Sequence, residues 1–270
     1  MFLLFFFVYI CNMNAIQQRI EIDKLNDRVK SPRFNDDQYY SAINQAIDMI
    51  LNDRIDNIKN PKKYSLQSVQ RIREELYTLV KNSTTLPIAN VLTFPTDYRY
   101  YLYLECTING VLDYFKPTTY NEIGPLKKNP FRKPDNEDNR YFNDVSTGLK
   151  LVYGNGALTT SSFDYLKTPN VVSIGYENNK VTTGTLTSGT TYYVYEEGVY
   201  AGTTYYEGQT VVGTGVALTS GIYIPSTVVV NCDMPEHLQK EINRMASAIM
   251  QGTIEDYMKK QQLELDNLKS

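Results

Sequence analysis

The chain has 270 residues, a length that suits one large domain or a core with one smaller domain. Hydrophobic residues make up 42% and charged residues 21%, which is typical of globular proteins and outside the disordered class. A net charge of −3 argues against a protein whose whole surface binds nucleic acid, because phosphate neutralisation needs clustered Lys and Arg. With 1 His, 3 Cys and no Trp, the composition favours a non-enzymatic α+β protein.

The N-terminus begins with an apolar run, residues 1–11, which is shorter than the roughly 20 residues of a membrane-spanning helix. Its length fits the apolar part of a secretion signal, but no basic residue precedes Arg19 and no small-residue cleavage site follows. We favour Met13 as the natural start, because the chain becomes polar and helix-like there. A short apolar segment that docks on a partner is the remaining alternative.

Residues 35–58 are predicted to form a helix. Asn35 and Gln38 have the spacing of a capping box, and Phe34 and Tyr39 stand where a hydrophobic staple would close. A second helix is expected to begin at Ser65. The short connection between the two helices predicts an antiparallel pair.

Asp97–Thr107 alternates Tyr and Leu with other residues at period two, which predicts a strand with one apolar face and one aromatic, polar face. An extension of the helical layer is the alternative, because short apolar runs are ambiguous. The apolar face is expected to comprise Tyr98, Tyr100, Leu102 and Leu104.

Turn signals divide the segment that follows. Asn109-Gly110 predicts a two-residue hairpin. Pro117–Pro134 is predicted to be a loop, because Gly-Pro and Asn-Pro pairs interrupt it. Further strands are expected at residues 149–153, 157–165 and 171–174.

Residues 181–230 differ in kind, because they are rich in Thr and Gly and contain no Lys or Arg. Their charges are Glu196, Glu197 and Glu207. Short β-prone runs between glycines predict a small module of hairpins, and a low-complexity tract is the alternative. Its tyrosines could stack on sugars, or they could belong to a strand-rich interaction surface. The crowded tyrosines are Tyr192, Tyr193, Tyr195, Tyr200, Tyr205 and Tyr206.

A C-terminal helix is predicted to begin after Asp233, which forms a capping-box pattern with Glu236. Gly252 separates this helix from an amphipathic tail, residues 253–270. The apolar residues of the tail are too sparse to form a core alone, so we expect the tail to dock on a neighbouring subunit. They are Ile254, Met258, Leu263, Leu265 and Leu268.

Few residues carry chemistry in a recognisable pattern. His237 is expected at the surface of the C-terminal helix, and Cys232 lacks the further ligands that a metal site with His237 would need. Gly154-Asn155-Gly156 and Gly213-Thr214-Gly215 are predicted to be hairpin turns, because neither opens a helix or carries the Lys of a phosphate loop. We therefore expect no catalytic residue, no metal site and no cofactor.

The remaining candidate functional residues are three cysteines and two charged clusters. Cys11, Cys106 and Cys232 lie far apart, which indicates reduced thiols. The acidic cluster at residues 135–138 lacks the spacing of a calcium loop. A basic cluster could contact DNA phosphates or an acidic subunit, or could be an exposed loop neutralised by those acids. Its members are Lys127, Lys128, Arg132 and Lys133.

Several landmarks together resemble the ring, or head-to-tail connector, proteins of short-tailed, crAss-like bacteriophages. They are Phe34-Asn35-Asp36-Asp37, Pro95-Thr96-Asp97-Tyr98, Asn129-Pro130-Phe131-Arg132-Lys133-Pro134, Tyr165-Leu166-Lys167-Thr168-Pro169 and Met234-Pro235-Glu236-His237-Leu238. The resemblance covers residues 30–175 and 226–270, and the insertion between them departs from a minimal connector.

The resemblance implies a structural virion protein without catalytic residues, assembled in the bacterial cytoplasm. Copies would form a twelve-fold ring that contacts the portal and other tail ring proteins and surrounds passing DNA, without a membrane. The expected fold is α+β: an antiparallel helical bundle packed with a β-sheet, plus an inserted small all-β module. The expected parts are an apolar extension (1–12), a helix–sheet–helix connector core (13–175 and 226–270) and the β module (176–225).

A second function stays open. The chain could be a secreted or surface binding module whose Tyr-rich β module binds glycan, with residues 1–12 as its signal.

Overall fold

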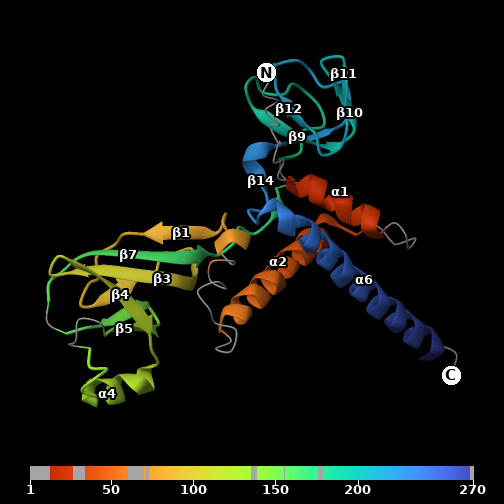
Figure 1. Cartoon of the computed structure of the whole chain (residues 1–270). Helices are drawn as coiled ribbons and strands as arrows, with labels where there is room; N and C mark the ends of the chain where they lie inside the picture. The colour runs from red at the N-terminus through yellow and green to blue at the C-terminus, as the bar shows by residue number, and fades with distance from the viewer. Residues whose placement is uncertain are drawn as a thin grey trace, which may run out of the picture. The chain divides into compact units, whose positions relative to one another are not determined.

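The computed structural model describes residues 13–26, 34–59, 70, 73–134, 139–154, 156–175 and 179–267, with the backbone alone for residues 57–59 and 253–267. Contacts divide the chain into two compact units. Residues 61–168 form the sheet unit, and residues 1–60 with 169–270 form the helical unit. Figure 1 shows the course of the chain through its helices and strands.

The sheet unit is built on one seven-stranded sheet. The β4–β5 pair is parallel and the other neighbouring pairs are antiparallel. In sheet order the strands are β1 (Val80–Ser83), β7 (Leu158–Lys167), β3 (Tyr98–Ile108), β4 (Val111–Pro117), β5 (Arg140–Val145), β6 (Gly148–Val152) and β2 (Val91–Thr93).

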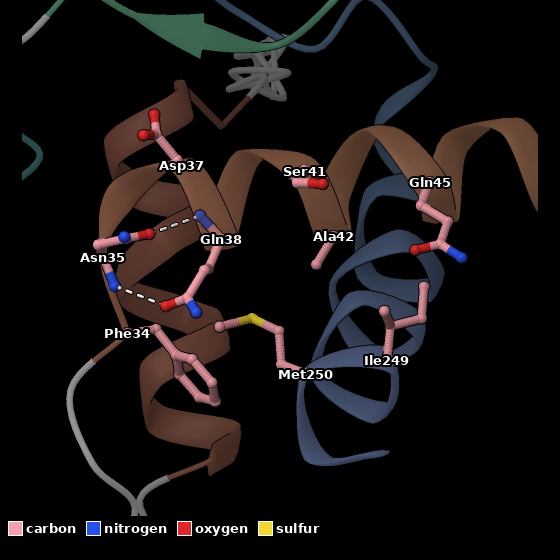
Figure 2. A pocket seen from close by; sticks show the side chains of 9 residues that line it. All are labelled: Phe34, Asn35, Asp37, Gln38, Ser41, Ala42, Gln45, Ile249 and Met250. Atoms are coloured by element: carbon pink, nitrogen blue, oxygen red, sulfur yellow. Dashed lines mark hydrogen bonds between the residues drawn. The ribbon is translucent and has the colours of Figure 1, made fainter. Parts of the chain in front are cut away.

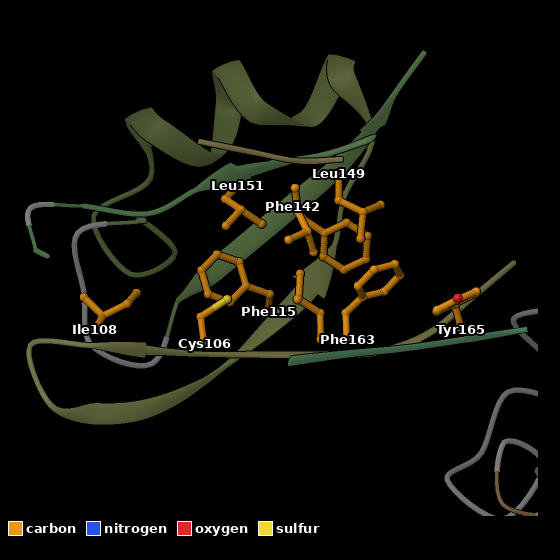
Figure 3. Packing of buried hydrophobic residues seen from close by; sticks show 10 residues of the cluster. Cys106, Ile108, Phe115, Phe142, Leu149, Leu151, Phe163 and Tyr165 are labelled. Atoms are coloured by element: carbon orange, nitrogen blue, oxygen red, sulfur yellow. The ribbon is translucent and has the colours of Figure 1, made fainter. Parts of the chain in front are cut away.

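One buried cluster in the sheet unit consists entirely of strand residues. Figure 3 shows the side chains of this cluster gathered between strands of the curled sheet. Its buried members are Leu92, Leu104, Cys106, Ile108, Phe115, Phe142, Leu149, Leu151, Phe163 and Tyr165. The sheet therefore curls to bury its own inner face.

This finding corrects the predicted fold class. The chain is not an antiparallel helical bundle packed with a β-sheet, since it is rich in strands and its large sheet curls as a half-barrel. The physical reason is that a periodic pattern identifies which face of an element is buried but not what covers that face. The apolar residues of β3 to β7 cover one another.

The predicted strand at residues 97–107 is confirmed as β3, but its alternation is partly wrong. Irregular pairing with β7 shifts the register between Tyr98 and Tyr100 and again between Tyr101 and Tyr103. Because a one-residue shift moves side chains to the other face, Tyr101 packs against the core, 4.6 Å from the ring of Phe142.

The predicted hairpin at Asn109-Gly110 is confirmed. Ile108 pairs with Val111, and the two turn residues have φ of +52° and +84°. Both values lie in the left-handed region that this tight hairpin turn requires.

The loop predicted at residues 117–134 contains a short helix, α4 (Tyr120–Lys128). Glu122 accepts hydrogen bonds from the backbone N–H of Thr119 and the hydroxyl of Thr118, both at 3.1 Å. This capping interaction stabilises the first turn. It begins the helix although Pro125 lies inside it.

Three helices dominate the helical unit: α1 (Ala15–Asn26), α2 (Asp36–Lys59) and α6 (Glu236–Asn267). Both α1 and α2 pack against α6. The predicted capping box of α2 is confirmed, since the side chains of Asn35 and Gln38 each accept the other's backbone N–H, at 2.9 and 3.0 Å. The staple is also confirmed, with the rings of Phe34 and Tyr39 5.8 Å apart.

The C-terminal helix begins at Glu236, and α6 continues through Gly252 to Asn267. Gly252 therefore does not end the helix. Two short strands, β8 (Ser173–Ile174) and β14 (Val229–Val230), pair on either side of the β module in sequence. The helix predicted from Ser65 lies partly outside the described residues, and its described part is helical at residues 70 and 73–75, before a turn that leads into β1 at Val80.

Residues 181–230 form strands, as predicted. A three-stranded sheet has the order β12 (Thr210–Val212), β9 (Thr191–Glu196) and β13 (Ile222–Pro225). A separate pair consists of β10 (Gly198–Tyr200) and β11 (Thr203–Tyr205). In the sequence, the 3-10 helix η1 (Ser226–Val228) follows β13. The buried core of this segment comprises Leu186, Tyr192, Val194, Tyr200, Val211 and Tyr223.

Candidate interaction surfaces

The tyrosines of the β module mostly serve its structure. Tyr192 is 4% exposed and Tyr200 is 1% exposed. The hydroxyl of Tyr200 accepts the backbone N–H of Thr214 at 2.6 Å. The six tyrosines Tyr192, Tyr193, Tyr195, Tyr200, Tyr205 and Tyr206 all lie within the described residues, and among them only Tyr206 is exposed. Buried rings cannot stack on a sugar, so the module offers little of the aromatic surface that glycan binding would need.

The β module is also fastened to two helices of the helical unit. The Arg19 guanidinium on α1 forms ion pairs with Asp36 and with Glu207 of the module. The ring of Tyr195 lies 4.2 Å from the same guanidinium, and its hydroxyl donates to Asp36 at 2.8 Å. Glu207 is thus engaged within the chain, whereas Glu196 and Glu197 are exposed at the junction of β9 and β10.

An open groove lies where the first turns of α2 meet α6 (Figure 2). Its volume is about 400 Å³. Polar groups of Asn35 and Gln38 are already paired with each other, as the dashed lines of Figure 2 show. The groove suits small apolar side chains better than a reacting substrate. The lining residues are Phe34, Asn35, Asp37, Gln38, Ser41, Ala42, Gln45, Ile249 and Met250.

A second surface lies on β4 in the sheet unit. Val111 is 62% exposed, Leu112 is 53% exposed and Tyr114 is 58% exposed. The ring of Tyr114 packs edge-on against Tyr103 of β3, 5.6 Å away, and Tyr103 donates its hydroxyl to Glu105 at 3.0 Å. Val111 lies on the same face of β4 as Phe115, which is buried in the core, whereas Leu112 and Tyr114 form an apolar row on the opposite face.

The four predicted basic residues lie together on a third surface, which we name the basic arm and define as residues 120–133. Lys127 and Lys128 end α4, and Arg132 and Lys133 follow it, all four exposed. The ring of Phe131 between them is 85% exposed. No residue of α4 is buried. The pKa of Glu122 is lowered by its hydrogen bonds to Thr119 and Thr118 and by the charge of Arg132, so this acid stays ionised beside the bases.

The other predicted residues are not brought into one site. The side chains of Ile254, Met258, Leu263 and Leu265, and all of Leu268, lie outside the described residues. His237 is exposed on the first turn of α6, whereas Cys232 is 3% exposed. In the described part of the chain, no three His, Cys, Asp or Glu side chains gather as metal ligands would. The acidic cluster at residues 135–138 lies outside it.

Sequence reasoning missed the apolar row on β4 and the exposed rings of the basic arm. A signal for the first was available, since Val111-Leu112 follows the Asn-Gly turn directly, where polar residues are usual. No described helix is long and apolar enough to cross a membrane. No protein-family model matches this sequence, and no curated protein matches it significantly.

Proposed function

We propose that this chain is a structural virion protein whose copies form a ring that joins the portal and head to the tail around the DNA channel. The proposal combines the resemblance of the sequence landmarks with the surfaces of the two units. A ring requires two different patches on each copy that fit one another and close. The chain offers several exposed patches for such contacts.

The observation that carries the proposal is the apolar row Leu112 and Tyr114 on the outer face of β4. The sheet unit has a core cluster of ten buried strand residues, and these two side chains lie outside it, 53% and 58% exposed. Exposed apolar side chains side by side on a strand are typical of a surface that another protein covers. A neighbouring copy is the partner that a homo-oligomeric ring supplies.

The alternative of a glycan-binding module receives less support. Its aromatic residues are the tyrosines that form the core of the β module or hold that module to α1 and α2. The surfaces described above are instead apolar or charged and are suited to protein contacts.

The test is a double variant, Leu112→Asp with Tyr114→Asp, compared with the wild-type chain by size-exclusion chromatography with light scattering. We expect the wild type to elute as an oligomer and the variant as a 31.0 kDa monomer, because a carboxylate cannot be buried unpaired at an apolar contact. Val171→Asp, at a residue 70% exposed in the helical unit, is the control and should leave the oligomer intact. A wild type that is monomeric at every concentration would refute the proposed function.

A further inference from the structure

The basic arm and the β module are two segments of opposite net charge. The arm contains four bases and one acid, Glu122. Residues 181–230 contain three acids and no base. The arm belongs to the sheet unit and the acids belong to the helical unit. Each copy thus carries a positive patch on one unit and a negative patch on the other.

Hydrogen bonds order the backbone of the basic arm, although no residue of its helix α4 is buried. The side-chain oxygen of Asn129 accepts the backbone N–H groups of Phe131 and Arg132, at 2.9 and 3.2 Å. Asn139 donates to the carbonyl of Phe131 at 2.8 Å. These bonds hold the backbone of Phe131 and Arg132 in place. A backbone that is already ordered reduces the entropy lost when the arm binds a partner.

The base of the arm is anchored in the sheet unit. Arg140, 6% exposed, donates to the carbonyl of Pro134 at 2.6 Å and to the carboxylate of Asp113 at 3.3 Å. The arm is therefore held at both ends, by the capping of α4 and by Arg140. It is a defined surface rather than a loose loop.

The acidic residues Glu196 and Glu197 of the β module also lie on an ordered part of the backbone. Glu196 ends β9 in the centre of its three-stranded sheet, and Glu197 follows directly. A Cβ at the next residue, Gly198, would come within 2.2 Å of the carbonyl oxygen of Ser220. This close approach fixes the turn that presents the two carboxylates. The nearby segment also exposes Tyr206, at 58%.

We propose that the basic arm of one copy docks on Glu196 and Glu197 of the next copy. The proposal rests on the ring function above and names the contact that gives the ring its direction. Two arms repel each other and two β modules repel each other, so opposite charges favour only the arm-to-module pairing. Such a pairing is head-to-tail, and head-to-tail contacts produce rings or filaments.

The experiment uses two complementary full-length variants. The arm-reversed variant carries Lys127→Glu, Lys128→Glu and Arg132→Glu, and the module-reversed variant carries Glu196→Lys and Glu197→Lys. We expect each variant alone to associate at least about tenfold more weakly than wild type, because like charges now face one another. Mixing the two variants should restore association, because every contact then pairs opposite charges again.

Sedimentation velocity of each variant, of their mixture and of the wild type gives the result. The wild-type association should weaken when NaCl rises from about 0.05 M to about 0.5 M, because salt screens exposed charges. Circular dichroism confirms that each variant is folded. A matched control, Lys150→Glu with Lys240→Glu and Arg244→Glu, makes the same change in net charge at other exposed bases and should associate as wild type does.

Each outcome has a distinct meaning. If the wild type forms rings but the reversed variants also form them, the docking proposal is wrong and the ring function stands. If the two variants pair on mixing but no closed ring appears, the docking stands and the ring function fails. If the arm-reversed variant loses binding to duplex DNA and mixing restores no association, the arm contacts phosphates instead, and the proposal is overturned.

Discussion

The guanidinium Nη1 of Arg19 lies 2.9 Å from Oδ1 of Asp36, a contact that joins α1 to α2. The same guanidinium pairs with Glu207, so one side chain holds α1, α2 and the β module together. Burial opposes the charge of Arg19, but the hydrogen bond to Asp36 and the electrostatic interactions with Tyr195, Asp36 and Glu207 raise its pKa overall. The guanidinium thus stays charged.

Arg19→Ala should lower the free energy of unfolding of the helical unit by about 2–3 kcal/mol, because two acids lose their partner. This cost is smaller than that of breaking a fully buried ion pair, because the Glu207 side chain is 37% exposed. Urea unfolding followed by the helical circular dichroism signal measures the change. Arg54→Ala is the control, since Asp53 and Glu241 are more exposed partners and the expected cost is about 1 kcal/mol or less. Equal costs for the two variants would contradict the central role of Arg19.

Gly148→Ala should destabilise the sheet unit by about 1–3 kcal/mol, because the added Cβ would lie 2.1 Å from the carbonyl oxygen of Leu92 and push β2 from β6. Gly124→Ala in α4 is the matched control, since nothing lies within 4 Å of its Cβ. That control should be neutral or stabilising by up to about 1 kcal/mol, because Ala favours helix. Thermal unfolding of both variants tests the close β2–β6 contact.

Cys106 and Cys232 should resist thiol reagents at pH 8. Burial raises the pKa of Cys106 to about 12 and that of Cys232 to about 11, so both thiols remain protonated below those values in the folded chain. The thiolate is the reactive form, and unfolding should restore ordinary reactivity. The measurement is the rate of reaction with a disulfide reagent, native and in urea, in a Cys11→Ser background. Fast reaction in the native state would show that these side chains are accessible.

Deleting residues 253–270 should leave both units folded and abolish assembly. The buried face of α6 includes Leu238, Ile242, Ala246 and Met250, all of which precede the deletion. Circular dichroism should show a loss of helical signal in proportion to the residues removed. Size-exclusion chromatography then compares the truncated and full chains. A truncated chain that assembles normally, or one that no longer folds, would show that the tail is not a docking element.

Local features of this fold could be predicted because they depend on a few neighbouring residues. The capping box of Asn35 and Gln38 and the hairpin of Asn109-Gly110 need only the right side chain or the right φ. The helix α4 was missed because Gly124-Pro125 indicated a loop, although Thr119 and Glu122 have capping-box spacing.

The fold class depended on distant contacts and could not be predicted in the same way. Nothing in the pattern around Leu104 or Phe163 shows that these residues would pack against other strands of a curled sheet rather than against helices. The tyrosines of the β module present the same difficulty. Alternation identifies two faces of a strand, but Tyr192 and Tyr200 became core residues because the small module has few other large side chains to fill it.

The ring itself is tested most directly by negative-stain electron microscopy of the purified full-length chain, with its mass measured by native mass spectrometry. The proposed function predicts closed rings with a central opening and a mass that is a whole multiple of 31.0 kDa. Particles of a single 31.0 kDa chain at every concentration, or open filaments without closed rings, would contradict it.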